Sequence, residues 1–194
     1  MRLLGVAYEH GNWSVGRDFE RIRRYNPLGR VPTLVLDDGS VLMESSAILD
    51  YFDESVGPER ALVPRSGRER RDCLQLMTLA IGAAESARDG IYEREFRPAD
   101  KRHQPWLDRR LQQMHGGLAE LETRVARRAT AQWLVGERMT QADITLTCCQ
   151  KLIADAVPLA PDAPYPLLRA RAARCELLPE FAATKADWFA PSTQ

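Results

Sequence analysis

The chain has little of what marks several large classes of protein. No apolar run among its 194 residues approaches the roughly 20 residues of a membrane-spanning helix, and its first residues lack the basic flank and apolar core of a secretory signal. Lysine plus arginine equals aspartate plus glutamate at 27 each, so we expect no bulk attraction to nucleic acid or to a membrane surface. The composition therefore predicts a cytoplasmic globular protein that recognises its partners at local sites.

Metal-ligating side chains are also few. The four cysteines, Cys73, Cys148, Cys149 and Cys175, contain no C-x-x-C pair, and the three histidines are not spaced as a metal site. We therefore expect no metal. The adjacent Cys148 and Cys149 leave a redox role open, but neighbours on a helix point about 100° apart, which favours packing.

Strand and helix signals divide the chain into two parts. Up to residue 52, short strand signals alternate with a helix-like stretch, whereas long amphipathic segments dominate after residue 65. The segment between them, residues 57–67, carries two prolines and two glycines, which is typical of a connector. We predict two domains, residues 1–57 and residues 66–194.

The expected elements follow from periodicity and turn residues. In the first part we expect a strand at 7–15, a helical segment at 17–24, a hairpin of 33–36 with 41–43, and a helix at 45–54 that buries Ile48, Leu49 and Phe52. In the second part we expect helices at 68–94, 104–128, 141–156, 166–176 and 179–187. Thr140, with Asp143 three residues later, predicts a capping box at the third of these helices.

Two runs in the first part indicate a ligand site. They read Asn26-Pro27-Leu28-Gly29-Arg30-Val31-Pro32-Thr33-Leu34 and Glu44-Ser45-Ser46-Ala47-Ile48. A proline that enters an apolar strand can hold a cis bond, and Val31 would then turn outward with free backbone groups. The N–H groups at the start of a helix attract a carboxylate, so a peptide can lie between the two runs.

Both runs also have a purely structural interpretation. A proline at the start of a buried strand can simply end a loop, and Glu44 and Ser45 can serve only as an N-terminal charge and a cap. Their combination, together with the capping box further on, favours a binding site.

The two runs resemble the corresponding segments of the cytosolic glutathione S-transferases, and the resemblance continues over nearly the whole chain. The stretch Trp133–Ile144, which holds the capping box, is similar to the start of a capped helix in that family. The resemblance implies a GST-like fold, with an α/β thioredoxin-like N-terminal domain and an all-α C-terminal helical bundle. It also implies a homodimer.

The resemblance assigns roles to five residues. Val31 and Pro32 would hold the backbone of glutathione, which is the expected co-substrate. Glu44 would pair with the γ-glutamyl ammonium group, and Ser45 would take the neighbouring carboxylate by its hydroxyl and N–H. Arg30 would reach the glycyl carboxylate or remain a solvated loop residue.

Relative to the family, the chain is expected to begin late. Met1–Glu9 resembles the end of the family's first helix and the start of its second strand. The first strand, most of the first helix and the Ser, Tyr or Cys that activates the thiol would then be missing, so the N-terminal domain would be incomplete. We predict no catalytic residue. A start assigned too late, a piece of a longer chain and a true short form all remain open.

The favoured function is that of a glutathione S-transferase-like protein, which binds glutathione and conjugates its thiol to a small electrophile. The alternatives are a non-catalytic binding or interaction module of the same fold, or another glutathione-dependent enzyme such as an isomerase, dehalogenase or reductase. The electrophile is not identified by the sequence. Five side chains of the second part either line its pocket or belong to the core: Met77, Tyr92, Phe96, Trp106 and Met114.

Overall fold

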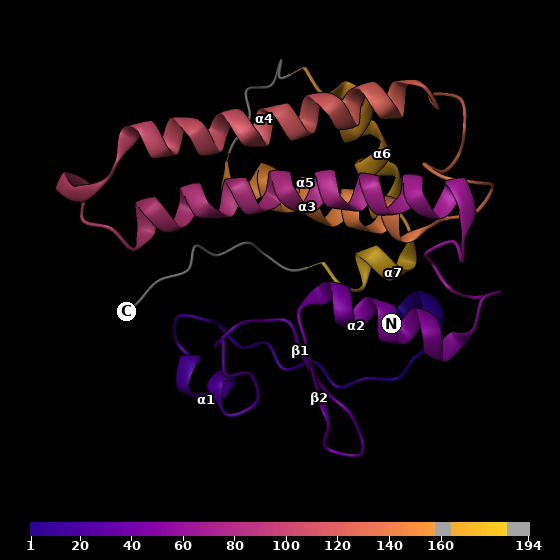
Figure 1. Ribbon diagram of the computed structural model, residues 1–194, viewed down its shortest axis with the longest axis horizontal. Helices are drawn as coiled ribbons and strands as arrows, with labels where there is room; N and C mark the ends of the chain where they lie inside the picture. The colour runs from indigo at the N-terminus through magenta and orange to yellow at the C-terminus, as the bar shows by residue number, and fades with distance from the viewer. Residues whose placement is uncertain (158–163, 186–194) are drawn as a thin grey trace. The chain divides into compact units, whose positions relative to one another are not determined.

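The computed structural model describes residues 1–157 and 164–185 of the chain. They form two compact units, of which the first holds Met1–Ala61 and the second begins at Leu62. In order, the first unit contains η1 (Arg2–Leu4), α1 (Phe19–Arg23), β1 (Thr33–Val35), β2 (Val41–Met43) and α2 (Ser45–Val56). The second contains α3 (Gly67–Glu95), η2 (Ala99–Lys101), α4 (Gln104–Ala126), α5 (Gln141–Ala156), α6 (Pro166–Glu176) and α7 (Pro179–Ala182) (Figure 1). The predicted domain boundaries, 1–57 and 66–194, stay a prediction.

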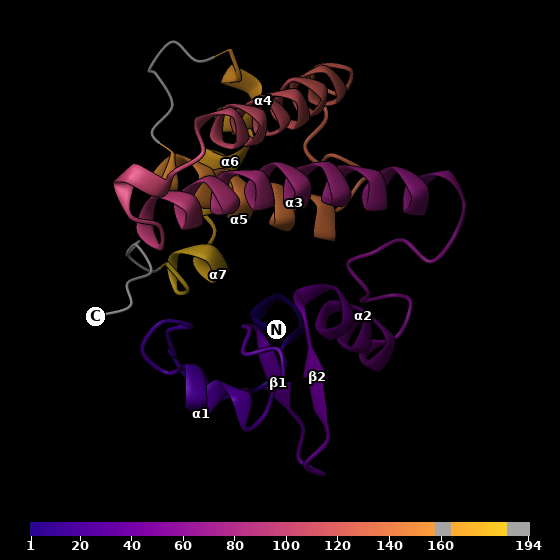
Figure 2. The same ribbon diagram turned by 60° about the vertical axis from the view of Figure 1, so that its left-hand side comes forward.

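The predicted hairpin is confirmed. β1 and β2 pair antiparallel with Leu34 opposite Leu42, and they are the two strands of the sheet in the described residues (Figure 2). Gly39 closes the turn at φ 83°, a conformation in which a Cβ would be strained. Its N–H donates to the Leu36 carbonyl at 2.9 Å, while Asp38 accepts the Ser40 N–H at 2.8 Å.

The strand predicted at residues 7–15 is wrong. This stretch is irregular, and every residue from Ala7 to Asn12 is exposed, so neither face of a strand would be covered. A strand also needs a backbone partner, and within the described residues the sheet contains only β1 and β2. Trp13, within this stretch, instead packs against Tyr25, with the two ring centroids 5.8 Å apart.

The helices of the first unit enclose a small core. Ile48 and Phe52 of α2 are buried as predicted, while Leu49 is half-buried. Their spacing of four residues places them on one side of the helix. α1 is shorter than predicted, at five residues, and contributes the buried Ile22.

Four helices pack side by side in the second unit. α3 lies along α4 and α5, and α6 contacts both α4 and α5 (Figures 1 and 2). α3 presents small residues to this core, and a Cβ added at Gly117 of α4 would come within 3.2 Å of the Ala83 Cβ. The absent side chain therefore lets the two helix backbones approach closely. The largest fully buried aliphatic side chains of the unit are Met114, Leu118, Leu121, Leu146, Ile153 and Leu168.

The start of α5 has the predicted capping box. The Thr140 N–H and hydroxyl both donate to the Asp143 carboxylate, at 2.9 and 3.0 Å, and the Leu134 N–H donates to its other oxygen at 2.9 Å. The predicted helix at 179–187 is shorter, because α7 ends at Ala182 in a turn. Residues 186–187 of that prediction lie outside the described residues.

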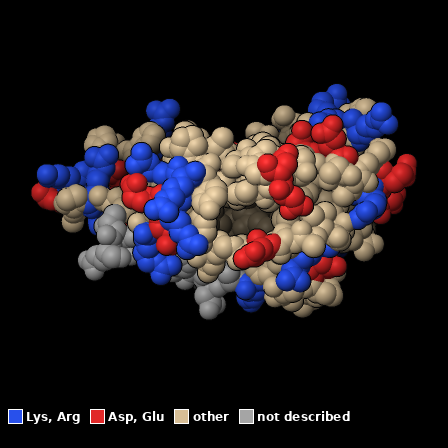
Figure 3. All heavy atoms as spheres, turned by 90° about the horizontal axis from the view of Figure 1, so that it is seen from below, with Lys and Arg blue, Asp and Glu red and all other residues tan. Residues whose placement is uncertain are grey.

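The surface charge is mixed in sign. On the face displayed in Figure 3, groups of lysine and arginine side chains and groups of aspartate and glutamate side chains are both present, separated by uncharged residues. This agrees with the equal numbers of the two signs in the sequence, 27 each.

Candidate functional site

The loop that enters β1 presents an open stretch of backbone. The Val31–Pro32 peptide bond is cis, as the sequence suggested. Val31 is 48% exposed, and in the described residues no hydrogen bond engages its N–H or carbonyl. A backbone group without a partner needs water or a ligand, so Val31 offers one donor and one acceptor.

The start of α2 is open as well. Its first internal bond runs from the Ile48 N–H to the Glu44 carbonyl, at 3.2 Å, and no side chain caps the helix. The N–H groups of Ser45, Ser46 and Ala47 therefore have no partner among the described residues. Sequence reasoning predicted exposed N–H groups at this helix start and named Ser45 as the residue that takes a carboxylate, and the structure adds the N–H of Ala47 to them.

Glu44 has a backbone conformation that non-glycine residues rarely adopt. It lies at φ 68° and ψ 140° and is the one non-glycine residue with positive φ in the described part of the chain. Such conformations cost about 1–3 kcal/mol and persist mainly at ligand sites and switch regions. Nothing in the sequence distinguishes this glutamate from an ordinary helix-start acid.

The structure brings the two predicted runs together. The Glu44 N–H donates to the Pro32 carbonyl at 3.3 Å, which ties the start of α2 to the loop before β1. The Arg30 guanidinium and the Glu44 carboxylate form an ion pair at 3.4 Å, with side chains 59% and 46% exposed. Water screens a pair this exposed, so it stabilises the fold little and is free to open for a ligand.

The arrangement has the chemistry of a peptide-binding site. Val31 can pair with a peptide backbone, while the three free N–H groups and the Ser45 hydroxyl can take a carboxylate. Glu44 can accept from an ammonium group beside that carboxylate. The five predicted residues, Arg30, Val31, Pro32, Glu44 and Ser45, thus lie on two adjoining segments of one unit.

The adjacent cysteines of α5 do not have the lowered pKa of a reactive thiol. In the described residues none of the four cysteines is part of a disulfide, and Cys73 and Cys175 are buried. Burial, followed by the neighbouring Cys148 and Glu85, raises the pKa of the Cys149 thiol to about 12. A thiol with this pKa holds almost no thiolate at neutral pH, which disfavours a redox role for the pair.

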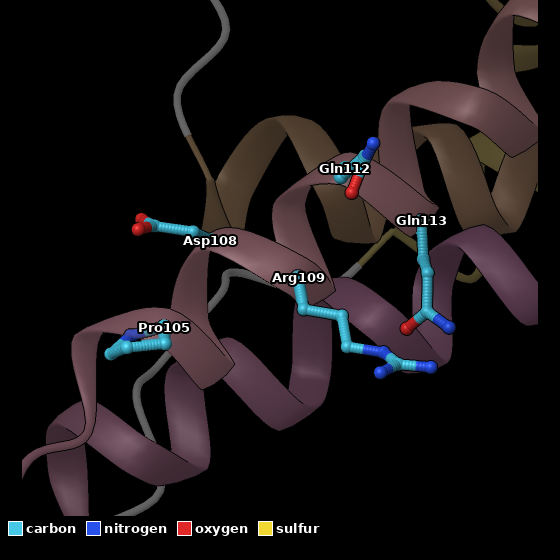
Figure 4. A pocket seen from close by; sticks show the side chains of 5 residues that line it. All are labelled: Pro105, Asp108, Arg109, Gln112 and Gln113. Atoms are coloured by element: carbon cyan, nitrogen blue, oxygen red, sulfur yellow. The ribbon is translucent and has the colours of Figure 1, made fainter.

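The five candidate pocket residues separate into two groups. Met77 and Met114 are buried in the helical core, whereas Tyr92, Phe96 and Trp106 are 38–41% exposed. A hollow of about 730 Å³ lies beside α4, lined by Pro105, Asp108, Arg109, Gln112 and Gln113. Figure 4 shows that all five of these side chains come from one helix, so the hollow is an open surface without an opposite wall.

Among residues 1–157 and 164–185, no three His, Cys, Asp or Glu side chains are grouped to hold a metal ion. In the same ranges every helix is too short or too polar to cross a bilayer.

Solved structures share this fold over almost the entire chain. A glutathione S-transferase from Methylobacterium radiotolerans, solved with glutathione sulfonate, is 28% identical with a TM-score of 0.85, over 98% of this chain and 86% of that one. A glutathione transferase family member from Pseudomonas fluorescens Pf-5, solved with S-(propanoic acid)-glutathione, is 32% identical with a TM-score of 0.72, over 84% and 79%. The chain thus has the GST-like fold, in which the first unit is thioredoxin-like and the second unit is all-helical.

Sequence comparison gives the same result. The profile described as "Glutathione S-transferase, N-terminal domain" matches residues 1–60, and that described as "Glutathione S-transferase, C-terminal domain" matches residues 104–170. The chain belongs to the glutathione S-transferase family.

Curated relatives extend beyond the matched region. Glutathione S-transferase GstA of Escherichia coli O157:H7 is 26% identical over 62% of this chain and 56% of its own length. A probable maleylacetoacetate isomerase of Vibrio cholerae is 29% identical over 82% of this chain and 72% of its own. The chain therefore spans little more than half of the first of these relatives.

Proposed function

We propose that the first unit binds glutathione through Arg30, Val31, Pro32, Glu44 and Ser45. The observation that carries the proposal is the open start of α2, joined to the open Val31 backbone by the bond from the Glu44 N–H to the Pro32 carbonyl. Both solved relatives described above contain a glutathione derivative, which supports the choice of ligand.

Each end of the tripeptide has a counterpart in the site. The free N–H groups and the Ser45 hydroxyl receive the γ-glutamyl carboxylate, and Glu44 receives the adjacent ammonium group. Val31 pairs with the cysteinyl backbone. Arg30 forms an exposed ion pair with Glu44, and it exchanges this partner for the glycyl carboxylate when glutathione binds.

The proposed activity is conjugation of the glutathione thiol to a small electrophile. A thiol of pKa about 8.5 is only a few per cent thiolate at neutral pH, so turnover needs a donor aimed at the sulfur. No catalytic residue is proposed among the five. We also propose that the protein is a cytoplasmic homodimer and that its two domains span residues 1–57 and 66–194.

One relative favours a second candidate. The match to the probable maleylacetoacetate isomerase covers 72% of that protein. Glutathione-dependent isomerisation uses the same glutathione site but consumes no thiol, so the two reactions are separable by product. A non-catalytic module of the same fold would bind glutathione and catalyse neither.

Calorimetry tests the binding proposal directly. Glutathione is titrated into the unchanged protein and into Glu44→Ala and Ser45→Ala, and each substitution is expected to raise Kd about tenfold or more through loss of a charge-assisted contact. The matched controls are Glu54→Ala at the far end of α2 and Ser40→Ala in the hairpin turn, both exposed. Equal losses in the controls, or no binding by the unchanged protein, contradict the proposal.

Activity is measured on the same proteins. Loss of an aryl chloride signal with consumption of thiol indicates conjugation, while conversion of maleylacetoacetate at constant thiol indicates isomerisation. Binding of glutathione without either reaction favours the non-catalytic module of the same fold.

A further inference from the structure

A completely buried asparagine lies at the base of the Val31 loop. Asn26 is 0% exposed, although both of its chain neighbours, Tyr25 and Pro27, are exposed. Its side-chain NH₂ donates to the Arg30 carbonyl at 3.0 Å and to the Thr33 hydroxyl at 3.1 Å, and its oxygen accepts the Leu28 N–H at 2.9 Å. A buried amide with three partners is costly to disturb, because each lost bond leaves a polar group unpaired.

Two further contacts hold the same loop. The Thr33 hydroxyl donates to the Arg30 carbonyl at 2.9 Å, so this carbonyl accepts two side-chain bonds. Gly29 lies at φ 64°, and a Cβ there would fall 2.2 Å from the Phe19 ring. The turn is therefore closed by glycine and packed from the side of α1.

These bonds hold the chain on both sides of Val31. The carbonyl of Arg30 precedes Val31 in the chain, and Thr33 follows two residues after it. Asn26 thereby satisfies the polar groups on both sides, while the Val31 N–H and carbonyl keep no partner in the described residues. The polar groups of the loop are therefore paired on both sides of Val31, and the backbone is open at Val31 itself.

We propose that Asn26 is a positioning residue for the glutathione site, acting through the Arg30 carbonyl and Thr33 to keep the Val31 backbone open. The inference rests on the proposed function. It assigns Asn26 no contact with the ligand. Its side-chain bonds all stay within residues 28–33, so its loss should loosen this loop and leave α2 in place.

Three variants test the role. Asn26→Asp keeps the size and the acceptor for Leu28, but it replaces the donor with a carboxylate oxygen facing the Arg30 carbonyl. Thr33→Val removes the bridging hydroxyl, and Thr33→Ser retains it. We expect the glutathione Kd to rise about tenfold in Asn26→Asp and a few-fold in Thr33→Val, with Thr33→Ser close to the unchanged protein.

Hydrogen exchange separates positioning from unfolding. In Asn26→Asp, exchange is expected to rise in residues 27–33 while α2 and the second unit keep their protection. If Asn26→Asp instead unfolds the first unit, exchange rises in α2 as well, and the comparison of Thr33→Val with Thr33→Ser then decides.

The outcomes of the proposal and of the proposed function are distinct. An unchanged Kd in Asn26→Asp, or equal Kd values in Thr33→Val and Thr33→Ser, overturns the positioning role while glutathione binding stands. Failure of the unchanged protein to bind glutathione overturns both.

Discussion

Two helix starts in this protein are built in opposite ways. At α5, the Asp143 carboxylate accepts from the Thr140 N–H, the Thr140 hydroxyl and the Leu134 N–H, and all of these groups are buried. At α2, Glu44 stands in a strained conformation and the next three N–H groups have no partner in the described residues. A satisfied start stabilises the fold, whereas an open start is available to a ligand.

The difference follows from what surrounds each start. α5 begins inside the helical core, where an unpaired N–H would cost about 1–3 kcal/mol. α2 begins at the surface, where water can satisfy the same groups in the free protein and a carboxylate can replace it. The two starts therefore predict different responses to substitution.

The largest effect is expected at Asp143. Asp143→Ala removes the acceptor of three buried bonds, so the free energy of unfolding should fall by about 3 kcal/mol. Chemical denaturation measures this loss. The control is Asp100→Ala, an exposed aspartate of η2, which should change stability by less than about 0.5 kcal/mol. Equal effects at the two positions would remove the distinction between a buried cap and an ordinary surface charge.

A third helix start, that of α6, is capped by a side chain of another helix. Glu122 of α4 accepts the N–H groups of Leu167 and Leu168, at 2.8 and 2.9 Å, and so caps α6 from 45 residues away in the sequence. Glu122→Ala should lower the free energy of unfolding by about 2 kcal/mol, and Glu122→Gln by about half as much because one acceptor oxygen is retained. If both variants melt at the same temperature as the unchanged protein, α6 needs no cap from α4.

Glu44 should respond in the opposite direction. Glu44→Gly relieves the strained conformation and is expected to stabilise the first unit by about 1 kcal/mol while weakening glutathione binding. Glu44→Ala removes the same carboxylate but keeps the strain, so affinity should fall without the gain in stability. Hydrogen exchange of α2 and calorimetry measure the two quantities, and a Glu44→Gly variant that loses stability would show that the backbone here is not strained.

The smallest effect is expected at Cys149 in α5. It concerns the reactivity of the thiol and not the stability of the fold. Because burial raises the pKa of Cys149 to about 12, its thiol stays protonated well above the ordinary cysteine range. Alkylation at pH 8 should therefore modify Cys149 much more slowly in the folded protein than in urea, where the thiolate fraction is ordinary. Mass spectrometry of labelled peptides measures both rates, and equal rates would contradict a buried thiol.

The sequence was most informative where structure is local. The hairpin turn at Asp38-Gly39, the capping box of Thr140 and Asp143, and the long amphipathic helices were all predicted, because each depends on residues close together in the chain. The expected strand at 7–15 is wrong because a strand needs a partner strand, which the residues of the segment itself do not reveal. The cap that Glu122 provides to α6 joins distant residues and leaves no local pattern.

The candidate site shows the same limit. Val31-Pro32 and the glutamate and serine before a helix could be read from the sequence, and the structure places them on adjoining segments. The positive φ of Glu44 and the ion pair between Arg30 and Glu44 could not, because both depend on how the loop meets α2. Asn26 before Pro27 reads as an ordinary turn residue, and only its burial distinguishes it.

The central claim is that the open Val31 backbone and the open start of α2 form one glutathione site. The most direct measurement is a titration of the isotope-labelled protein with glutathione, followed by the backbone amide resonances. The amides of Val31, Ser45 and Ser46 are expected to shift together along one binding curve, while the capped amides of Thr140 and Leu134 stay fixed. Shifts that leave Val31 and Ser45 unchanged, or that follow separate curves at the two segments, would contradict this claim.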